Sequence, residues 1–137
     1  GIVKGIDYSP VSVEKSQRVN ADAIAKGRCT ILQGSVAKRI FAEGWFDAVT
    51  AFETVYFWPE LPQCFHEIHR MLKPGGMFLI CNESSGDTDK DEKWTKIIDG
   101  MTIYKDIELK ADLEQAGFRD VQIHKNKWGW LCVTARK

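Results

Sequence analysis

The sequence predicts an α/β fold with one open sheet, parallel in its first part and antiparallel at its end. Short apolar segments rich in β-branched residues alternate with helical segments over residues 1–82. The segments at 48–52 and 77–82 are apolar almost throughout, which is typical of strands in a parallel sheet. Apolar and polar residues alternate over 120–135, as in an antiparallel hairpin. No linker or repeat divides the chain, so residues 1–137 are predicted to form a single domain.

The first strand and helix are predicted from local signals. Residues 1–7 form a short apolar run that ends in Asp7, which predicts a buried strand. Ser9 is a good N-cap and Pro10 a good first helical residue, because proline presets φ and its missing N–H would be unpaired there. We expect this helix to continue to about Lys26, before Gly27.

The middle of the chain reads as strands and helices ended by glycine or proline. The clearest helix has apolar residues at i, i+3, i+4 and i+7 and polar residues on its other face. The third strand is apolar almost throughout, so we expect it to be central and buried on both faces. The predicted elements are a strand over 29–33, a short helical or irregular piece over 36–44, a strand over 45–52, a helix over 61–72 ended by Pro74-Gly75-Gly76, and a strand over 77–82.

The last third of the chain begins with a polar stretch. Residues 84–93 are expected to form an exposed loop, followed by apolar residues at near-helical spacing from Trp94 to Tyr104. Asp106 or a neighbour caps a last helix over 107–116, and Gly117 ends it. The hairpin follows, with strands over 120–124 and 128–135.

The charge balance argues against two classes of partner. The chain has 19 Lys and Arg against 19 Asp and Glu, with no basic stripe, and binding to nucleic acid or to an anionic membrane needs a local basic excess. Apolar runs such as 77–81 are far shorter than the roughly 20 residues of a membrane span. No signal peptide is readable. We therefore predict no nucleic-acid partner and no membrane association.

Cysteines and histidines do not form a recognisable metal or disulfide pattern. The four cysteines lie in separate segments, which is typical of free thiols in a cytoplasmic protein: Cys29, Cys64, Cys81 and Cys132. His66 and His69 stand at i and i+3, whereas a zincin helix needs i and i+4. We interpret them as a solvated helix face and predict no metal.

The candidate site is at the carboxyl ends of the predicted parallel strands, where open sheets bind ligands. Asp7 and Tyr8 follow the first strand, and a carboxylate there can accept both hydroxyls of a ribose. An aspartate at a strand end is at least as often a turn or cap residue. The other strand ends carry Gly34 and Ser35, Phe52, Glu53 and Thr54, and Asn82 and Glu83.

Taken together, several short motifs resemble the class I S-adenosylmethionine-dependent methyltransferases, and most closely their small-molecule group. The motifs are Asp7-Tyr8-Ser9, Gln33-Gly34-Ser35, Phe46-Asp47-Ala48-Val49, Met71-Leu72-Lys73-Pro74-Gly75-Gly76 and Gln115-Ala116-Gly117-Phe118. The Leu-Lys-Pro-Gly-Gly turn is the most specific of them. The resemblance covers essentially the whole chain and implies a Rossmann-like sheet, S-adenosylmethionine as the cofactor and a small-molecule methyl acceptor.

The resemblance also implies roles for particular residues. Asp7 would bind the ribose hydroxyls and Tyr8 would lie beside the adenine ring. Gly34, Ser35 and Val36 would contact the adenine edge, although many relatives carry an acid where Ser35 stands. Phe52 and Glu53 would lie where the chain passes the methionine part of the cofactor and the transferable methyl group.

Two residues after the third strand are the candidates for a catalytic role. A general base is needed only where the acceptor must lose a proton, and the family has no fixed catalytic residue. Glu53 and Tyr56 are the residues we would test for that role. Glu53 could equally be a surface acid that accepts a backbone N–H. Trp94, Met101 and Tyr104 fall in the segment that often covers the acceptor, or they form the apolar side of a packed helix.

The chain departs from the family pattern at its beginning. The family's first strand and its G-x-G-x-G turn have no counterpart here, so we expect a sheet that is incomplete at the N-terminus and a truncated domain. The strands at 1–7 and 45–52 would then pair directly, be covered by another copy, or belong to a longer protein. Exposed strand edges would favour a homo-oligomer.

Two alternatives to an active methyltransferase follow from this departure. The first is a truncated, non-catalytic methyltransferase-like domain that does not bind the cofactor on its own. The second is a nicotinamide dinucleotide enzyme, which also uses an acid after its second strand. The Leu72–Gly76 turn and the closing hairpin argue against the second alternative.

Overall fold

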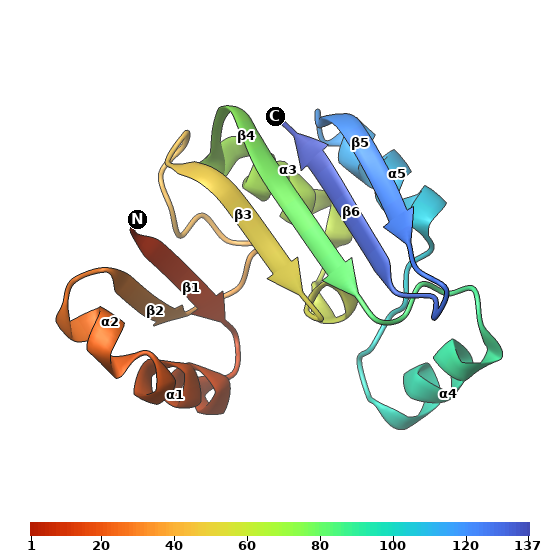
Figure 1. Ribbon diagram of the computed structural model, residues 1–137, viewed down its shortest axis with the longest axis horizontal. Helices are drawn as coiled ribbons and strands as arrows, with labels where there is room; N and C mark the ends of the chain where they lie inside the picture. Colours follow the sequence, from red (N-terminus) through yellow and green to blue (C-terminus); the bar gives the residue numbers. More distant parts are fainter. The chain divides into compact units, whose positions relative to one another are not determined.

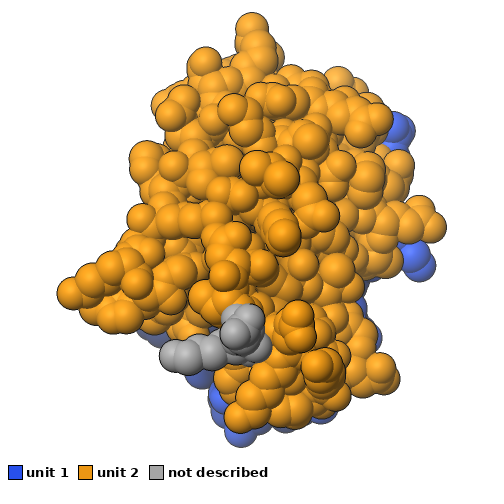
Figure 2. Space-filling view, turned by 90° about the vertical axis from the view of Figure 1, so that its right-hand side faces the viewer, with its two compact units in different colours: residues 1–40 blue, residues 41–137 orange. Residues whose placement is uncertain are grey.

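The computed structural model describes residues 1–137, apart from the side chains of residues 89 and 90. The chain divides into two compact units, residues 1–40 (unit 1) and residues 41–137 (unit 2), which are coloured separately in Figure 2. The expectation of a single domain over 1–137 stays a prediction.

Unit 1 is a two-stranded parallel sheet with two helices. Strand β1 (Val3–Asp7) pairs with β2 (Cys29–Gln33) in register from Val3 opposite Cys29 to Asp7 opposite Gln33. Helices α1 (Pro10–Val19) and α2 (Ala21–Ala25) connect them (Figure 1). β1 and β2 are confirmed as strands, but β1 is half-exposed rather than buried.

The predicted helix from Pro10 to Lys26 is interrupted at Asn20. Its start is as expected, because the Ser9 Oγ accepts the N–H of Ser12 at 3.3 Å. The Asn20 backbone leaves the helical region, with φ −100° and ψ 16°. Its side-chain amide also donates to the Ser16 carbonyl at 2.8 Å. Asparagine competes with the helix for backbone partners in this way, which explains the break.

Unit 2 contains a four-stranded sheet with the order β3-β4-β6-β5. The expected change from parallel to antiparallel pairing is confirmed, since β3 and β4 are parallel while β6 is antiparallel to both β4 and β5. The strands are β3 (Phe46–Phe52), β4 (Leu72–Asn82), β5 (Arg119–Lys125) and β6 (Leu131–Arg136).

Strand β3 is an edge strand, which corrects the expectation of a central strand buried on both faces. It pairs with β4, and of its seven residues only Ala51 is buried. Strand β1 belongs to the sheet of unit 1 and β3 to the sheet of unit 2. An edge strand leaves one row of backbone N–H and C=O groups unpaired. Self-association through such edges stays a prediction.

The Pro74-Gly75-Gly76 segment lies within β4 rather than in a turn before it. The register with β3 shifts between Phe46 and Ala48, so this part of the strand is irregular. Gly75 has a φ of 78°, which favours glycine. A Cβ on Gly76 would lie 2.9 Å from the Lys73 carbonyl oxygen, so only glycine fits there without a shift.

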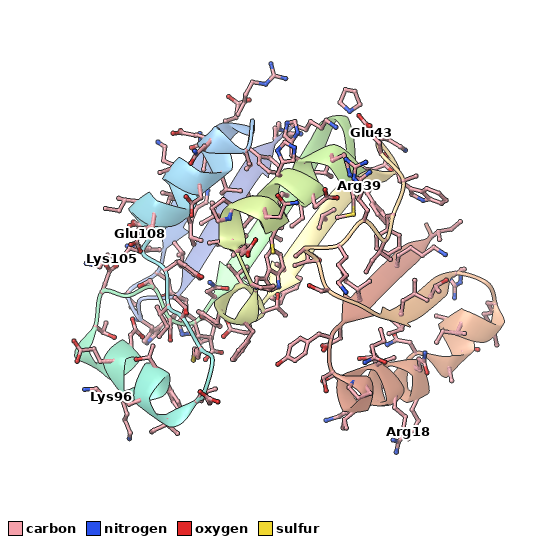
Figure 3. All side chains as sticks on the ribbon, turned by 180° about the vertical axis from the view of Figure 1, so that it is seen from behind. Arg18, Arg39, Glu43, Lys96, Lys105 and Glu108 are labelled. Atoms are coloured by element: carbon pink, nitrogen blue, oxygen red, sulfur yellow. The ribbon has the colours of Figure 1, made fainter. Side chains whose placement is uncertain are left out.

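Two helices cover one face of the four-stranded sheet. Both α3 (Leu61–Met71) and α5 (Asp106–Gln115) lie on the same side of it (Figure 1). Between helix and sheet, the Phe78 ring lies 5.8 Å from the ring of Phe65 and 5.8 Å from that of Phe118. Helix α5 begins at Asp106, and Lys105 rather than Asp106 is its N-cap. The Glu108 carboxylate accepts the Lys105 N–H at 2.7 Å, and both side chains lie at the start of α5 (Figure 3).

The segment between β4 and α5 lies beyond the carboxyl end of β4. It contains helix α4 (Asp89–Ile97), which ends before the residues from Ile98 to Tyr104 that the sequence placed in a helical pattern (Figure 1). The expected exposed loop is partly buried, because Ser84 is 8% and Ser85 1% exposed. A further short element is the 3-10 helix η1 (Val55–Phe57), where a helical turn follows β3. Throughout the described residues, no helix is long and apolar enough to cross a bilayer.

Candidate functional site

The carboxyl ends of β1 and β2 bring five of the predicted site residues together within unit 1. The Asp7 carbonyl accepts the Gly34 N–H at 2.9 Å, so the loops after the two strands are side by side. One oxygen of the Asp7 carboxylate, Oδ1, accepts the Ser9 N–H at 2.8 Å, while Oδ2 has no hydrogen-bond partner among the described residues. The Tyr8 side chain is 66% exposed. This strand end therefore presents a carboxylate oxygen and an aromatic ring.

The loop after β2 is shaped by Gly34. A Cβ there would lie 2.3 Å from Cδ1 of Ile40, so a larger residue would require the Ile40 side chain to shift. The Ser35 hydroxyl accepts the Ala37 N–H at 3.3 Å, in a local turn. Val36 follows as a half-buried side chain in the same turn. These contacts fix the backbone of residues 34–37 beside Asp7.

Glu53 has an unusual backbone conformation at the end of β3 in unit 2. Its φ is 54°, a left-handed value that costs energy for a residue with a side chain and that is often found at functional sites. Its Oε1 accepts the Glu83 N–H at 2.5 Å, which ties it to the loop after β4. Burial raises the pKa of the Glu53 carboxyl above its usual range, the bond from the Glu83 N–H opposes this, and the Glu83 charge raises it further.

Tyr56 holds the next amide of the same loop. The side chain is buried, and its hydroxyl oxygen accepts the Ser84 N–H at 2.9 Å and lies 3.3 Å from the Ser84 carbonyl oxygen. Burial raises the pKa of Tyr56 to about 12, so the phenol is neutral at ordinary pH. Glu53 and Tyr56 therefore hold the consecutive residues 83 and 84 in place.

Phe52 lies apart from these contacts, on the strand before Glu53. Its side chain is 58% exposed and its register partner is Cys81. Cys81 faces Cys132 across the antiparallel β4–β6 pair, with the two sulfur atoms 3.6 Å apart. Burial and the neighbouring thiol raise the pKa of Cys81 to about 11, so this thiol is protonated at neutral pH.

A cavity of about 460 Å³ opens beside residues 83 and 84. Its lining comes from the loop after β4, from α4 and from the hairpin turn between β5 and β6. The lining residues are Glu83, Ser84, Thr88, Asp91, Trp94, Trp128, Gly129 and Trp130. Sequence reasoning singled out Trp94 but missed Asp91 and the two hairpin tryptophans. The Trp128-Gly129-Trp130 spacing around a hairpin turn was the available signal, because it exposes two large aromatic side chains where a turn is usually polar.

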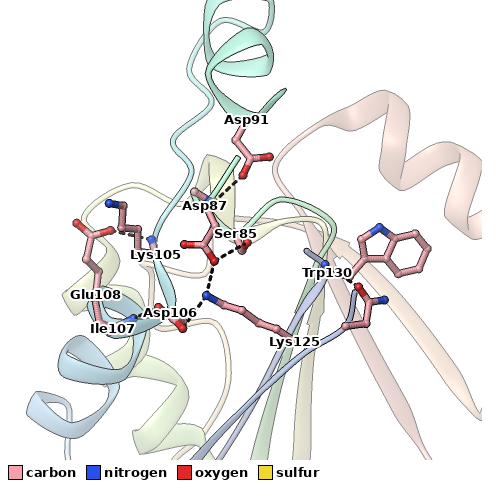
Figure 4. A network of polar contacts seen from close by, with 11 residues as sticks. Ser85, Asp87, Asp91, Lys105, Asp106, Ile107, Glu108, Lys125 and Trp130 are labelled. Atoms are coloured by element: carbon pink, nitrogen blue, oxygen red, sulfur yellow. Dashed lines mark hydrogen bonds and ion pairs between the residues drawn. The ribbon is translucent and has the colours of Figure 1, made fainter. Parts of the chain in front are cut away.

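The walls of this cavity are held by an ion-pair network. The Lys125 ammonium lies between the carboxylates of Asp87 and Asp106, at 2.7 Å from the latter (Figure 4). The bond from Lys125 holds the pKa of Asp106 below its usual range. The Asp91 carboxylate accepts the Gly86 N–H at 2.8 Å. The network ties the hairpin to the start of α5 and to the loop after β4.

One buried side chain at this end of the sheet is unpaired. Asn82 is 3% exposed, and neither its Nδ2 nor its Oδ1 has a hydrogen-bond partner among the described residues. Buried amides are normally paired, so this group is an exception that calls for a reason. It is the last residue of β4, directly before Glu83.

The predicted site residues thus fall into two groups, one in each unit. The group in unit 1 is Asp7, Tyr8, Gly34, Ser35 and Val36, and the group in unit 2 is Phe52, Glu53 and Tyr56. Of the two histidines on α3, His69 packs its ring edge-on to Phe118 at 5.1 Å, and His66 is exposed. A search of the described residues finds no group of three or more metal-ligating side chains.

The alternating strands and helices form an α/β fold of the class I methyltransferase type. The sequence model of a methyltransferase domain family matches residues 1–80, which is more than half of the chain. The chain belongs to this family of S-adenosylmethionine-dependent methyltransferases.

One similar curated protein is 24-methylenesterol C-methyltransferase 3 of Arabidopsis thaliana, which is 27% identical over 131 residues. The match covers 88% of this chain and 36% of that protein. The chain spans well under half the length of the curated relatives it matches.

Solved structures show the same fold at low identity. A chain in the complex between the Haloferax volcanii Trm112 methyltransferase activator and a methyltransferase matches with a TM-score of 0.86 at 21% identity, over 99% of this chain and 71% of that one. The [4+2]-cyclase SpnF matches with a TM-score of 0.79 at 18% identity, over 99% and 66% of the two chains. Because one of these neighbours is a cyclase, the fold alone does not determine the reaction.

Proposed function

We propose that this chain takes part in S-adenosylmethionine-dependent methyl transfer to a small-molecule acceptor. The observation that carries the proposal is the carboxyl end of the β1–β2 pair, where Asp7 and the loop at Gly34 lie side by side. Membership of the methyltransferase domain family also supports the proposal. The names of relatives such as the sterol C-methyltransferases make a small organic acceptor the natural choice.

The residues of unit 1 fit the ribose and adenine of the cofactor. Asp7 has one carboxylate oxygen fixed by the Ser9 N–H and a second oxygen without a partner among the described residues, so the free oxygen can accept a ribose hydroxyl. The exposed Tyr8 ring offers a face on which a flat base can stack. The backbone at Gly34, Ser35 and Val36 would follow the adenine edge.

The residues of unit 2 would act at the acceptor side. When bound, S-adenosylmethionine supplies a methyl group that its sulfonium has already activated. The chain's own contribution is then mainly positioning and exclusion of water. Phe52 would supply an exposed apolar ring for the methionine part. Glu53, whose pKa is raised by burial, would accept a proton from acceptors that must lose one. Tyr56, buried and neutral, would hold the loop at Ser84 in place.

Calorimetric titration with S-adenosylhomocysteine tests the proposal directly. Asp7→Asn keeps the shape of the side chain and an oxygen for the Ser9 N–H, but removes the charge. We expect it to weaken binding by roughly 10- to 100-fold, because hydrogen bonds to charged groups are worth about 1.5–3 kcal/mol. Asp22→Asn, at an exposed ion pair with Lys26 in the same unit, is the matched control and should leave binding unchanged.

The other outcomes separate the alternatives. Absence of heat at high ligand concentration would overturn the proposal for this chain and favour a methyltransferase-like domain that does not bind the cofactor by itself. Equal weakening by Asp7→Asn and Asp22→Asn would exclude Asp7 as the ribose ligand. Heat with NAD instead of S-adenosylhomocysteine would indicate a nicotinamide dinucleotide site.

A further inference from the structure

We infer that the cavity beside residues 83 and 84 binds an organic cation, an ammonium group carried on an apolar body. This site lies wholly within unit 2 and involves none of the residues proposed to bind the cofactor. Its volume of about 460 Å³ is in the usual range of small-molecule sites, roughly 300–1,000 Å³. Three features of the cavity favour an organic cation: its aromatic walls, the sign of its charges and its rigid support.

Three indole rings from two separate segments line the cavity. Trp94 comes from α4, and Trp128 and Trp130 come from the hairpin turn. All three side chains are between 46% and 69% exposed, which is costly for residues this apolar unless the surface has a use. The face of an indole ring attracts cations more strongly than that of any other side chain.

The charges of the lining have one sign. Among the residues whose side chains the structure describes, the lining has two carboxylates, Glu83 and Asp91, and no lysine or arginine. Asp91 is 8% exposed and is fixed by the Gly86 N–H, whereas the Glu83 side chain is exposed and makes no ion pair with a described residue. An ammonium group between the indole faces and these carboxylates would be attracted by both. An anion would be repelled by both.

Two lysines of the hairpin, Lys125 and Lys127, already have partners. The Lys125 ammonium points between Asp87 and Asp106, away from Trp130 (Figure 4). The Lys127 ammonium lies 4.6 Å from the centre of the Trp128 ring. This internal contact shows that an indole of the cavity already accepts a cation, and it makes Lys127 a competitor for any ligand there.

The support of the site is rigid. Asn126 Oδ1 accepts the N–H groups of both Trp128 and Trp130, at 2.9 and 3.0 Å, which fixes the hairpin turn. Glu53 and Tyr56 hold the N–H groups of Glu83 and Ser84. Preorganised groups lose little entropy when a ligand binds. If the proposed methyl transfer holds, this site would bind the acceptor as an amine or its methylated product. This identification of the ligand rests on the proposed function, whereas the binding of an organic cation does not.

Calorimetric titration of the full chain with choline tests the inference without the cofactor. Its neutral isostere, 3,3-dimethylbutan-1-ol, has the same shape without the charge. We expect choline to bind and the isostere to bind at least tenfold more weakly, and the difference to shrink as salt is raised. The choline titration contains no cofactor, so a failure of the chain to bind S-adenosylhomocysteine would not affect its result.

Two variants with matched controls locate the site. Glu83→Gln removes the charge and keeps the backbone N–H for Glu53, and we expect it to weaken choline binding roughly tenfold. Glu92→Gln, on α4 but outside the cavity lining, should have no effect. Trp130→Leu should weaken binding roughly 3- to 30-fold, whereas Trp45→Leu, at a similarly exposed tryptophan elsewhere in unit 2, should not.

A third variant should act in the opposite direction. Lys127→Met removes the internal cation from the Trp128 ring, so we expect choline to bind more tightly, by a few-fold. Equal binding of choline and its isostere would overturn the inference and indicate an apolar site. Absence of binding, or equal effects of Glu83→Gln and Glu92→Gln, would overturn it as well.

Discussion

The two units of this chain differ in how they are stabilised. Among residues 1–40, Val13 is the one apolar side chain that is buried, while six large apolar side chains are exposed there, including Ile2, Tyr8 and Val19. The buried apolar residues from 41 onward include a continuous aromatic and aliphatic core between the sheet and α3 and α5. A two-stranded sheet buries little apolar surface to offset the conformational entropy that the chain loses on folding. A four-stranded sheet covered by two helices buries much more.

The comparison indicates a division of tasks. Unit 2 has a core, an ion-pair network and a cavity with fixed walls. Unit 1 presents strand-end loops with few buried contacts. Regions of low local stability are the ones that ligands can order. We therefore expect unit 2 to dominate the stability of the chain and unit 1 to respond most to a bound cofactor.

The largest effect is expected from a core truncation in unit 2. Phe65→Ala removes a ring that is 0% exposed and contacts Phe78, so we expect a loss of about 3–5 kcal/mol in the free energy of unfolding. Val13→Ala in unit 1 should cost about 1 kcal/mol or less, because its surroundings can collapse more easily. Urea unfolding followed by circular dichroism measures both.

The control for this pair is Phe52→Ala, at an exposed ring of the same residue type. It should change the free energy of unfolding by about 0.5 kcal/mol or less. Comparable losses for Val13→Ala and Phe65→Ala would contradict the difference between the units.

The next effect has the opposite sign. Asn82→Leu replaces a buried amide without partners by an apolar side chain of similar size, and we expect unfolding to cost about 1–3 kcal/mol more. Asn126→Leu is the contrast, because it removes an oxygen that accepts two backbone N–H groups and should destabilise. A loss of stability in Asn82→Leu, measured by thermal and urea unfolding, would show that the amide has a partner in solution.

A smaller effect is expected at the ion-pair network of unit 2. Lys125→Met leaves Asp87 and Asp106 without their cation and should cost roughly 1 kcal/mol, since these groups are partly exposed and screened by salt. The pKa of Asp106 is lowered by Lys125, so the contribution is present above the carboxyl's ordinary pKa and lost as pH falls through the lowered one. The difference between wild type and variant should therefore be constant from about pH 5 to 8 and shrink below about pH 4. A difference that grows in acid would rule this account out.

The sequence predicted the element order and the change from parallel to antiparallel pairing, because these depend on local periodicity. It did not predict that β3 is an edge strand, since an apolar run such as residues 48–52 does not reveal how many neighbours a strand has. The sequence did not predict the break at Asn20, because the helix over residues 10–26 was predicted from the pattern of many residues. One side chain that binds the Ser16 carbonyl changes that pattern little.

The candidate site was predictable only in part, because local sequence patterns do not show which distant segments come into contact. Asp7 and Gly34 follow from their places at strand ends, which the alternation of elements reveals. The cavity depends on contacts between α4, the loop after β4 and a hairpin turn more than 30 residues further on, and such pairing of distant segments leaves no periodic signal. The partial burial of Ser84 and Ser85 in a polar stretch was unexpected for the same reason.

Hydrogen exchange with and without S-adenosylhomocysteine tests the central claim most directly. Without ligand, we expect the amides of β1 and β2 to exchange faster than those of β4 and β6. With ligand, exchange should slow at residues 7–9 and 33–36 in unit 1. Equal protection of the two units without ligand, or ligand-induced protection confined to unit 2, would contradict the claim that unit 1 is the weakly stabilised, cofactor-binding part.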